Sequence, residues 1–238
     1  KFYNYFNNLA KKRNIRTISF GFSKKSDIRP LQIKNINNNK FIKIKSFKKE
    51  LKFNYNNINI YNILISLAVL DILNLDQKKI IKDISNLEPP EGRGKIYGIK
   101  RFNTNFRLID ESYNANPLSF KNAISNISAI KRDDFKKYIL IGDMLELGDK
   151  SIFFHKKLSQ IINNADIDKV FIYGNKIRET YKNIQKEKRG NILQSINDFD
   201  EIFSKILNKN DYLMIKGSNA TNLNKLSNKI IMGKKYAF

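Results

Sequence analysis

The sequence of 238 residues contains no cysteine, no tryptophan, one histidine and only four prolines. Without cysteine the chain forms no disulfide bonds and offers no thiolate to a metal ion, as is common in the cytoplasm. No run of about 18 apolar residues occurs, so the sequence predicts no membrane-spanning helix. We therefore expect a cytoplasmic globular protein, and an apolar fraction of 41% is enough for a buried core.

Acidic residues are also scarce. The 45 Lys and Arg residues outnumber 22 Asp and Glu residues, and the formal net charge is +23. Such an excess invites a nucleic-acid-binding interpretation. The lysines are, however, scattered through a chain rich in lysine, asparagine and isoleucine, and no basic run alternates regularly with base-stacking aromatic residues. Composition bias is therefore the better explanation of the positive charge. A positive electrostatic field would also attract a phosphate-rich substrate, so the charge alone does not discriminate.

The segment Glu88–Gly94 (EPPEGRG) contains two prolines and two glycines. Prolines end a helix and glycines loosen the chain that follows, so the segment predicts a domain boundary. We expect one domain in residues 1–88 and a second in residues 89–238.

Before the boundary, Arg16–Phe22 is rich in β-forming residues and predicts a strand. Alternating apolar and polar residues in Phe41–Phe47 and Leu51–Tyr55 predict a hairpin with one solvated face. The apolar segment Asn59–Leu73 predicts a largely buried helix, and Gln77–Leu87 predicts an amphipathic one.

Beyond the boundary, apolar strands alternate with helices, which favours an α/β fold with a mainly parallel, doubly wound sheet. The expected strands are Lys95–Ile99, Phe106–Ile109, Tyr138–Ile141, Lys169–Tyr173, Asn191–Leu193 and Tyr212–Ile215. The expected helices are Leu118–Ile130, Ser151–Asn163, Lys176–Gln185, Asp198–Leu207 and Thr221–Ile230.

Three polar loops follow expected strands directly. They are Asp110–Pro117 (DESYNANP), Gly142–Gly148 (GDMLELG) and Lys216–Ser218 (KGS). Ligands of open α/β sheets bind at the carboxyl ends of the strands. The three loops are therefore predicted to converge on one binding rim.

In this order, the three loops resemble the C-terminal part of the Mur ligase family, and the resemblance runs from about Ile15 to Ile230. The first two loops are specific, whereas Lys-Gly-Ser alone would be weak. The match is best to members that add D-alanyl-D-alanine to UDP-N-acetylmuramoyl-tripeptide during peptidoglycan synthesis. It implies that residues 1–88 are the C-terminal part of a central ATP-binding domain and that residues 89–238 are a Rossmann-like C-terminal domain.

The sequence contains no Gly-x-x-x-x-Gly-Lys-Ser/Thr phosphate loop. In the family, that loop and the lysine and acidic groups that hold Mg²⁺ precede the segments present here. The resemblance therefore implies ATP and Mg²⁺ as cofactors of a longer protein, of which this chain is an inactive fragment. A natural split protein is the alternative. We predict neither a catalytic nor a metal-ligating residue within the chain.

The resemblance implies a nucleotide site at Arg93 and at Asp110 or Glu111, because a guanidinium pairs with phosphate and a carboxylate accepts ribose hydroxyls. Asn59 and Asn62 stand in the family's His-Asn-x-x-Asn motif, although isoleucine replaces its histidine. The amide of Asn59 would bind adenine. The structural alternative for Arg93 and Glu111 is a salt bridge across the linker.

The resemblance also implies that the rim holds the dipeptide. Carboxylates of the second loop would bind its ammonium group, and the Lys-Gly-Ser loop would bind its carboxylate. The candidate residues are Ser112, Asn114, Asn116, Asp143, Glu146, Lys216 and Ser218.

Several of these roles have a structural alternative. Asn116 stands directly before Pro117, where an amide often caps a helix. Ser218 could likewise be only a helix cap, and the acidic loop only a charged connection. His155, without metal-ligating partners in the sequence, is interpreted as structural.

Two rival functions stay open. One is another ligase of the same superfamily, which adds a single amino acid or extends folylpolyglutamate. The other is a non-catalytic basic module for nucleic acid, whose binding would depend strongly on salt. For the favoured dipeptide ligase, the partners are UDP-N-acetylmuramoyl-tripeptide and D-alanyl-D-alanine, with no membrane or nucleic acid, and we expect a monomer.

Overall fold

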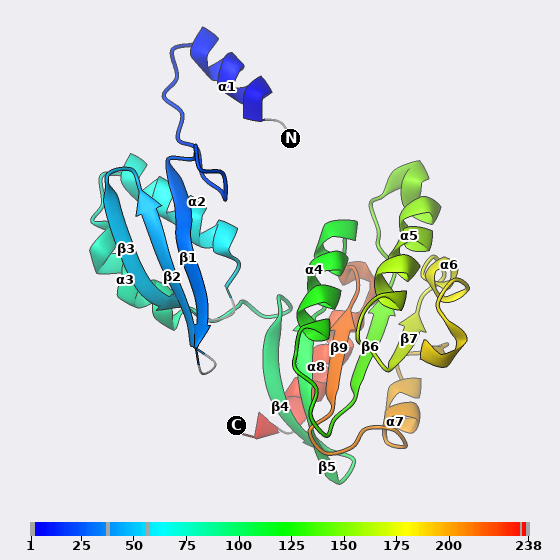
Figure 1. The fold of residues 1–238 in the computed structure, drawn as a ribbon. Helices are drawn as coiled ribbons and strands as arrows, with labels where there is room; N and C mark the ends of the chain where they lie inside the picture. The colour runs from blue at the N-terminus through cyan, green and yellow to red at the C-terminus, as the bar shows by residue number, and fades with distance from the viewer. Residues whose placement is uncertain (1–2, 37–38, 56–57, 234, 237–238) are drawn as a thin grey trace. The chain divides into compact units, whose positions relative to one another are not determined.

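The computed structural model describes residues 3–36, 39–55, 58–233 and 235–236 (Figure 1). The chain divides into two compact units, Lys1–Pro89 and Pro90–Phe238, so the division falls within the proline pair. Each unit has its own apolar core and is described by itself.

The first unit contains an antiparallel sheet with the order β1-β2-β3, formed by Ile28–Ile36, Asn39–Ser46 and Lys49–Tyr55. Inward residues of the sheet, such as Ile42, Ile44 and Phe53, are buried with apolar residues of the helices α2 (Ile60–Ile72) and α3 (Gln77–Asn86). The hairpin and both helices predicted from the sequence are confirmed. A further helix, α1 (Tyr3–Lys12), has no buried residue.

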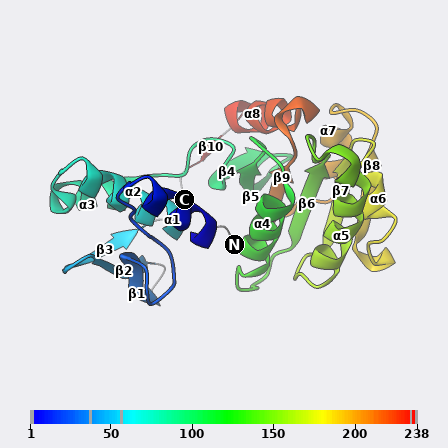
Figure 2. The same cartoon turned by 90° about the horizontal axis from the view of Figure 1, so that it is seen from above.

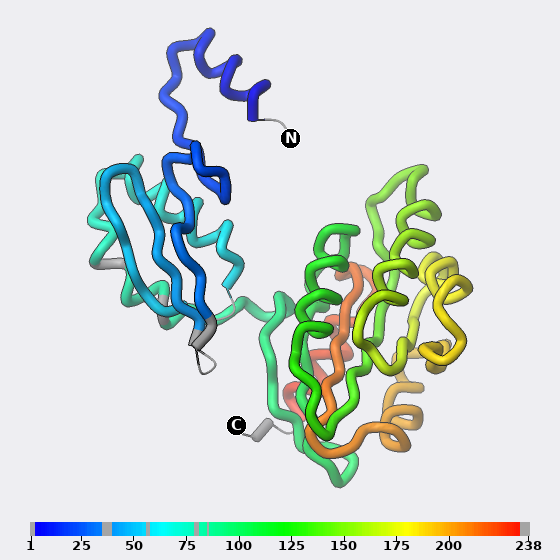
Figure 3. Tube along the Cα trace, in the orientation of Figure 1, coloured from blue at the N-terminus to red at the C-terminus, as the bar shows by residue number. Residues whose placement is uncertain are grey.

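The predicted strand Arg16–Phe22 was wrong. Only Phe20 forms an isolated bridge, to Ile28, and the chain between α1 and β1 follows an irregular path (Figure 3). Asp27 accepts hydrogen bonds from the backbone N–H of Ser19 at 2.8 Å and from its hydroxyl at 2.6 Å. Side-chain bonds of this kind compete with strand pairing.

Helix α2 is less buried than its apolar composition predicted. Asn59 caps it, and Ile63, Leu64, Leu67 and Ala68 face the core. The opposite face carries an apolar stripe at helical spacing, formed by Tyr61, Ile65, Val69 and Ile72, whose exposed fractions are 44–60%. Half of the helix is therefore open to solvent in this chain.

The second unit is built on a sheet with the strand order β10-β4-β5-β9-β6-β7-β8 (Figure 1). β4 pairs antiparallel with β5 and with β10, and all other neighbours are parallel. The strands are β4 (Lys95–Arg101), β5 (Thr104–Glu111), β6 (Lys137–Gly142), β7 (Lys169–Tyr173), β8 (Arg189–Leu193), β9 (Tyr212–Lys216) and β10 (Lys235–Tyr236).

Helices cover both faces of this sheet, as Figure 2 shows. One core joins Ile109 and Ile139 to α4 and α5, whereas the other joins their neighbours Leu108 and Tyr138 to α7 and α8. Successive residues of a strand point to opposite faces, so the doubly wound α/β fold is confirmed. The helices are α4 (Pro117–Ser128), α5 (Ser151–Asn163), α6 (Arg178–Tyr181), α7 (Asp198–Phe203) and α8 (Leu223–Gly233), with short 3₁₀ turns η1 (Gly148–Lys150), η2 (Lys186–Lys188) and η3 (Asn219–Thr221).

Helix α6 is shorter than the predicted segment Lys176–Gln185. The guanidinium of Arg189 donates to the backbone carbonyls of Lys182 and Ile184. The side-chain amide of Asn183 donates to the backbone carbonyl of Glu179. Side chains thus satisfy carbonyls that a longer helix would have used.

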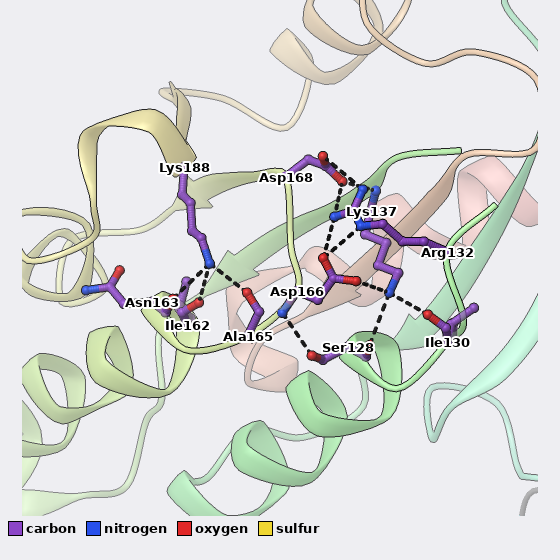
Figure 4. A network of polar contacts seen from close by, with 10 residues as sticks. All are labelled: Ser128, Ile130, Arg132, Lys137, Ile162, Asn163, Ala165, Asp166, Asp168 and Lys188. Carbon is purple, nitrogen blue, oxygen red and sulfur yellow. Dashed lines mark hydrogen bonds and ion pairs between the residues drawn. The ribbon is translucent and has the colours of Figure 1, made fainter. Parts of the chain in front are cut away.

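Two lysines, Lys137 and Lys188, close the C-terminal ends of α4 and α5 (Figure 4). The buried Nζ of Lys137 donates to the carbonyls of Ser128 and Ile130 and to Asp166. The Nζ of Lys188 donates to three carbonyls at the end of α5, those of Ile162, Asn163 and Ala165. These ammonium groups satisfy carbonyls that the helix ends leave open.

Across the described part of the chain, none of the helices combines the length and apolar character that crossing a membrane would need.

Candidate functional site

The three polar loops meet at one edge of the second unit's sheet. β9 lies between β5 and β6 and is parallel to both, so Lys216 is in register with Glu111 on one side and with Ile141 on the other. The carboxyl ends of the three strands therefore coincide, and the predicted convergence on one rim is confirmed.

Asp110 holds the start of the rim together instead of facing solvent. Its side chain is 1% exposed and accepts the backbone N–H of Gly92 at 2.9 Å. It also accepts the N–H and, at 2.6 Å, the hydroxyl of buried Ser112. These bonds give Asp110 and Ser112 a structural role in the rim, and the ligand roles expected for both residues stay predictions.

Gly92 and Gly94 let the linker run against the end of β5. Their φ angles are +71° and +90°, a region that favours glycine. A Cβ on Gly92 would lie 2.7 Å from Cβ of Tyr113, and one on Gly94 would lie 3.0 Å from a carboxylate oxygen of Glu111. The linker therefore brings Arg93 to the rim.

Glu111 and Lys216 form an ion pair, with 3.4 Å between the ammonium nitrogen and the carboxylate, and the side chain of Glu111 is 18% exposed. The ammonium also donates to the carbonyl of Asn114 at 2.9 Å, and Lys216 is only 1% exposed. Burial raises the pKa of Glu111 and lowers the pKa of Lys216, and in each case the effect outweighs the attraction between the pair. Lys216 thus supports the rim from below.

Arg93 is exposed, and its guanidinium carbon lies 4.4 Å from the centroid of the Tyr113 ring. Stacking of this kind orients the guanidinium while its N–H groups stay available. Among the described residues, no salt bridge joins Arg93 to Glu111. The structural alternative, a salt bridge across the linker, was therefore wrong. The rim presents a cation and a carboxylate to solvent within one short segment.

Asn116 is a helix cap. Its Oδ1 accepts the N–H of Ser119 at 2.8 Å, and the hydroxyl of Ser119 accepts the N–H of Asn116, forming a capping box for α4. Asn114 is exposed, and its Oδ1 accepts the N–H of Ala115 at 2.7 Å. The structural alternative thus holds for Asn116, while the amide nitrogen of Asn114 stays free to meet a ligand.

The two acids of the second loop have different surroundings. Asp143 accepts the backbone N–H groups of Asn175 and, at 2.7 Å, Ile177, so it fixes the turn that follows β7. Its expected contact with an ammonium group is therefore not supported. Glu146 is exposed and has a φ of +61°, in the left-handed region.

The loop is anchored from below by the single histidine. His155 is fully buried, its Nε2 accepts the N–H of Met144 at 3.1 Å, and its Nδ1 lies 2.8 Å from the carbonyl of Ser151. The structural interpretation of His155 is confirmed.

Ser218 ties two loops together. Its hydroxyl accepts the N–H of Leu145 at 2.9 Å and donates to the carbonyl of Ala115 at 3.4 Å. It makes no side-chain cap to the turn η3, so the alternative of a simple helix cap was wrong.

A pocket of about 590 Å³ opens between these loops and the start of α8. We name it the rim pocket, and it is lined by Tyr113, Asn114, Leu145, Glu146, Ser218, Asn219, Ala220, Asn222, Asn224 and Lys225. Asn114, Glu146 and Ser218 were predicted from the sequence. Tyr113, Asn222, Asn224 and Lys225 were not, because a side chain in a helix or turn gives no sign of the cavity that it borders.

Asn59 and Asn62 belong to the first unit and are both exposed. Oδ1 of Asn59 accepts the N–H of Tyr61 at 2.9 Å as the cap of α2, which leaves its amide nitrogen as a donor. In the described residues, no group of three or more His, Cys, Asp or Glu side chains is placed to hold a metal ion.

An open doubly wound α/β unit with polar loops at the carboxyl ends of its strands has the Rossmann-like fold, a class in which ligands bind at that edge of the sheet. The family model described as "Mur ligase, glutamate ligase domain" matches residues 92–219, more than half of the chain. The chain therefore belongs to the Mur ligase family.

Individual relatives agree with this assignment. The UDP-N-acetylmuramoyl-tripeptide–D-alanyl-D-alanine ligase of Rickettsia prowazekii is 28% identical over 236 residues, which cover 94% of this chain and 49% of the relative. A solved MurF ligase from Thermotoga maritima in complex with ADP has a TM-score of 0.76 at 20% identity and covers 97% of this chain and 52% of its own. A MurF structure from Acinetobacter baumannii has a TM-score of 0.77 at 18% identity, with coverages of 98% and 50%. The chain spans about half the length of the curated relatives that match it over most of its length.

Proposed function

We propose that this chain is the C-terminal portion of an ATP-dependent ligase that adds D-alanyl-D-alanine to UDP-N-acetylmuramoyl-tripeptide in peptidoglycan precursor synthesis. The observation that carries the proposal is the rim, where an exposed guanidinium, a carboxylate and a polar pocket meet in the family's own loop order. The name of the Rickettsia relative supports the choice of substrates.

In the proposed reaction, the terminal phosphoryl group of ATP is transferred to the carboxylate of the tripeptide and gives an acyl phosphate and ADP. The amine of the dipeptide then attacks the acyl carbon, loses a proton and displaces phosphate as the amide bond forms. This chain would contribute binding and orientation, which can lower a barrier by several kcal/mol, roughly 7–11 at best.

The donor set of the rim fits a nucleotide. Arg93 offers a planar, oriented guanidinium to phosphate oxygens, and Glu111 offers a carboxylate to ribose hydroxyls. Asp110 is the weaker candidate for the ribose contact, because its oxygens are occupied. In the first unit, we propose Asn59 and Asn62 separately as nucleotide-binding amides. The described residues do not fit a Mg²⁺ site, so we assign no step of the reaction to the ion within this chain.

We further propose that residues 1–88 are the C-terminal part of a central ATP-binding domain and that residues 89–238 are a C-terminal domain. The exposed stripe on α2 supports the first assignment, because contiguous apolar faces are normally covered. The isolated chain is therefore expected to bind weakly and not to catalyse.

The experiment is a ligation assay on the complete reading frame that contains this sequence. With ATP and UDP-N-acetylmuramoyl-tripeptide, the enzyme is offered D-alanyl-D-alanine, single D- and L-amino acids and glutamate in competition. We expect pentapeptide product with release of ADP and phosphate. Preference for a single amino acid would instead identify another ligase of the superfamily, and product formation by residues 1–238 alone would refute the assignment as an inactive portion.

A further inference from the structure

The rim pocket carries charge of both signs. Glu146 comes from the loop after β6, and Lys225 comes from the first turn of α8. They are the two charged side chains in the lining, both are exposed, and neither forms an ion pair with another described residue. The remaining polar groups are the neutral amides of Asn114, Asn219, Asn222 and Asn224 and the hydroxyls of Tyr113 and Ser218.

Lys216 is not available to a carboxylate in this pocket. Its ammonium group is buried beneath the loop and donates to the carbonyl of Asn114 and to Glu111. Moving it to the pocket would leave the partly buried carboxylate of Glu111 without its partner, which costs free energy. A carboxylate bound in the rim pocket therefore needs another cation.

Lys225 meets that need. It stands one helical turn before Lys229, which is also exposed but does not line the pocket. A lysine ammonium on a flexible stem reaches a carboxylate without a fixed geometry, and the amides beside it can donate further hydrogen bonds.

We propose that Lys225 binds the carboxylate of the amino substrate while Glu146 binds its ammonium group, so that the rim pocket selects a short peptide with both ends free. The inference rests on the proposed function and names residues for its second substrate. Two extended residues span roughly 7 Å, which separates the two charges enough to engage two side chains from different elements. A single amino acid holds its charges much closer together.

The test measures binding to residues 1–238 by calorimetry or by NMR shifts, at millimolar ligand. Three probes are compared: D-alanyl-D-alanine, its C-terminal amide and its N-acetyl derivative. The variants are Lys225→Gln, Glu146→Gln and, as a matched control on the same helix, Lys229→Gln.

We expect the unmodified chain and Lys229→Gln to prefer the free dipeptide over its amide by roughly two- to fivefold, as suits an ion pair at an exposed site. Lys225→Gln should bind the free dipeptide and the amide equally. Glu146→Gln should lose the preference for the free amine over the N-acetyl form and keep the preference for the free carboxylate. A pattern in which each variant affects its own end cannot come from general loss of structure.

The inference is overturned if Lys225→Gln still prefers the free carboxylate, or if the unmodified chain responds to none of the three probes. Neither result would contradict the proposed function, because that function is tested separately by the ligation assay, which measures product from the complete enzyme. A failed ligation together with the expected pattern would instead mean that the pocket binds zwitterionic peptides for another reaction.

Discussion

Nε2 of His155 accepts the backbone N–H of Met144 at 3.1 Å, so the only histidine of the sequence is the support of the loop that carries Glu146. His155 and Met144 are both fully buried. The loop is therefore positioned by a helix that lies beneath it and takes no part in the pocket.

Replacing His155 by leucine is expected to leave the Met144 N–H buried without an acceptor and to lower the free energy of unfolding by about 1–3 kcal/mol. Urea denaturation measures the loss, and hydrogen exchange at Met144 should accelerate more than exchange in the sheet. Lys156→Leu, at the exposed neighbouring position, is the control. Unchanged exchange at Met144 would contradict the proposed support.

Gly92→Ala is expected to destabilise the second unit more than Gly148→Ala. Both positions have positive φ, which costs an alanine about 1 kcal/mol. Only at Gly92 would the new Cβ also collide with the backbone of Tyr113, 2.9 Å away, whereas it meets nothing within 4 Å at Gly148. Thermal unfolding of both variants measures which loses more stability. Equal decreases in melting temperature would show that the linker moves to accommodate the new Cβ without destabilising the unit.

Lys137→Met is expected to lower the free energy of unfolding by about 1–3 kcal/mol, because the carbonyls of Ser128 and Ile130 lose their buried donor. Lys188→Met removes the equivalent donor from the end of α5 and should have a similar effect. Lys229→Met, which removes an exposed lysine, is the control. If the Lys137 variant unfolds like the control, water replaces the ammonium group at no cost.

Acid should weaken the network around Asp166. Hydrogen bonds from Arg132 and Lys137 lower the pKa of Asp166 from 3.8 to about 2. A lowered pKa in the folded state adds stability above pH 3.8, and that part is lost as the pH falls towards 2. Asp166→Asn should therefore show a shallower decline in melting temperature across this interval than the unmodified chain, with Asp149→Asn as an exposed control. An identical slope would mean that the pair is fully screened.

Sequence patterns located most of the fold. The strands β4 to β9 of the second unit were predicted within a few residues, because apolar runs such as those that form β6 and β7 are buried on both faces and stand out from their neighbours. The two-residue strand β10 was not predicted. The irregular segment Arg16–Phe22 was missed because its β-rich composition resembles that of a strand, while the bonds between Ser19 and Asp27 depend on residues outside it.

The candidate site was predicted at the level of loops but not of side chains. Asp110 and Asp143 were expected at the ligand, yet both accept backbone N–H groups from segments far away in the sequence. Glu111 and Glu146, of the same chemical type, are the acids that the rim presents. A carboxylate accepts hydrogen bonds inside the fold wherever N–H donors converge on it, and only the folded chain determines where they converge.

The sequence by itself determined the α/β class, the strand–loop–helix order and the family, because hydrophobic periodicity and short motifs are local properties of the chain. The tertiary structure alone decided which charges serve the fold and which meet solvent. Lys216 and Lys225 lie nine positions apart and carry the same group. One is buried under Asn114 beside Glu111 and the other lines an open pocket, because strand pairing and helix packing set burial from contacts between distant segments.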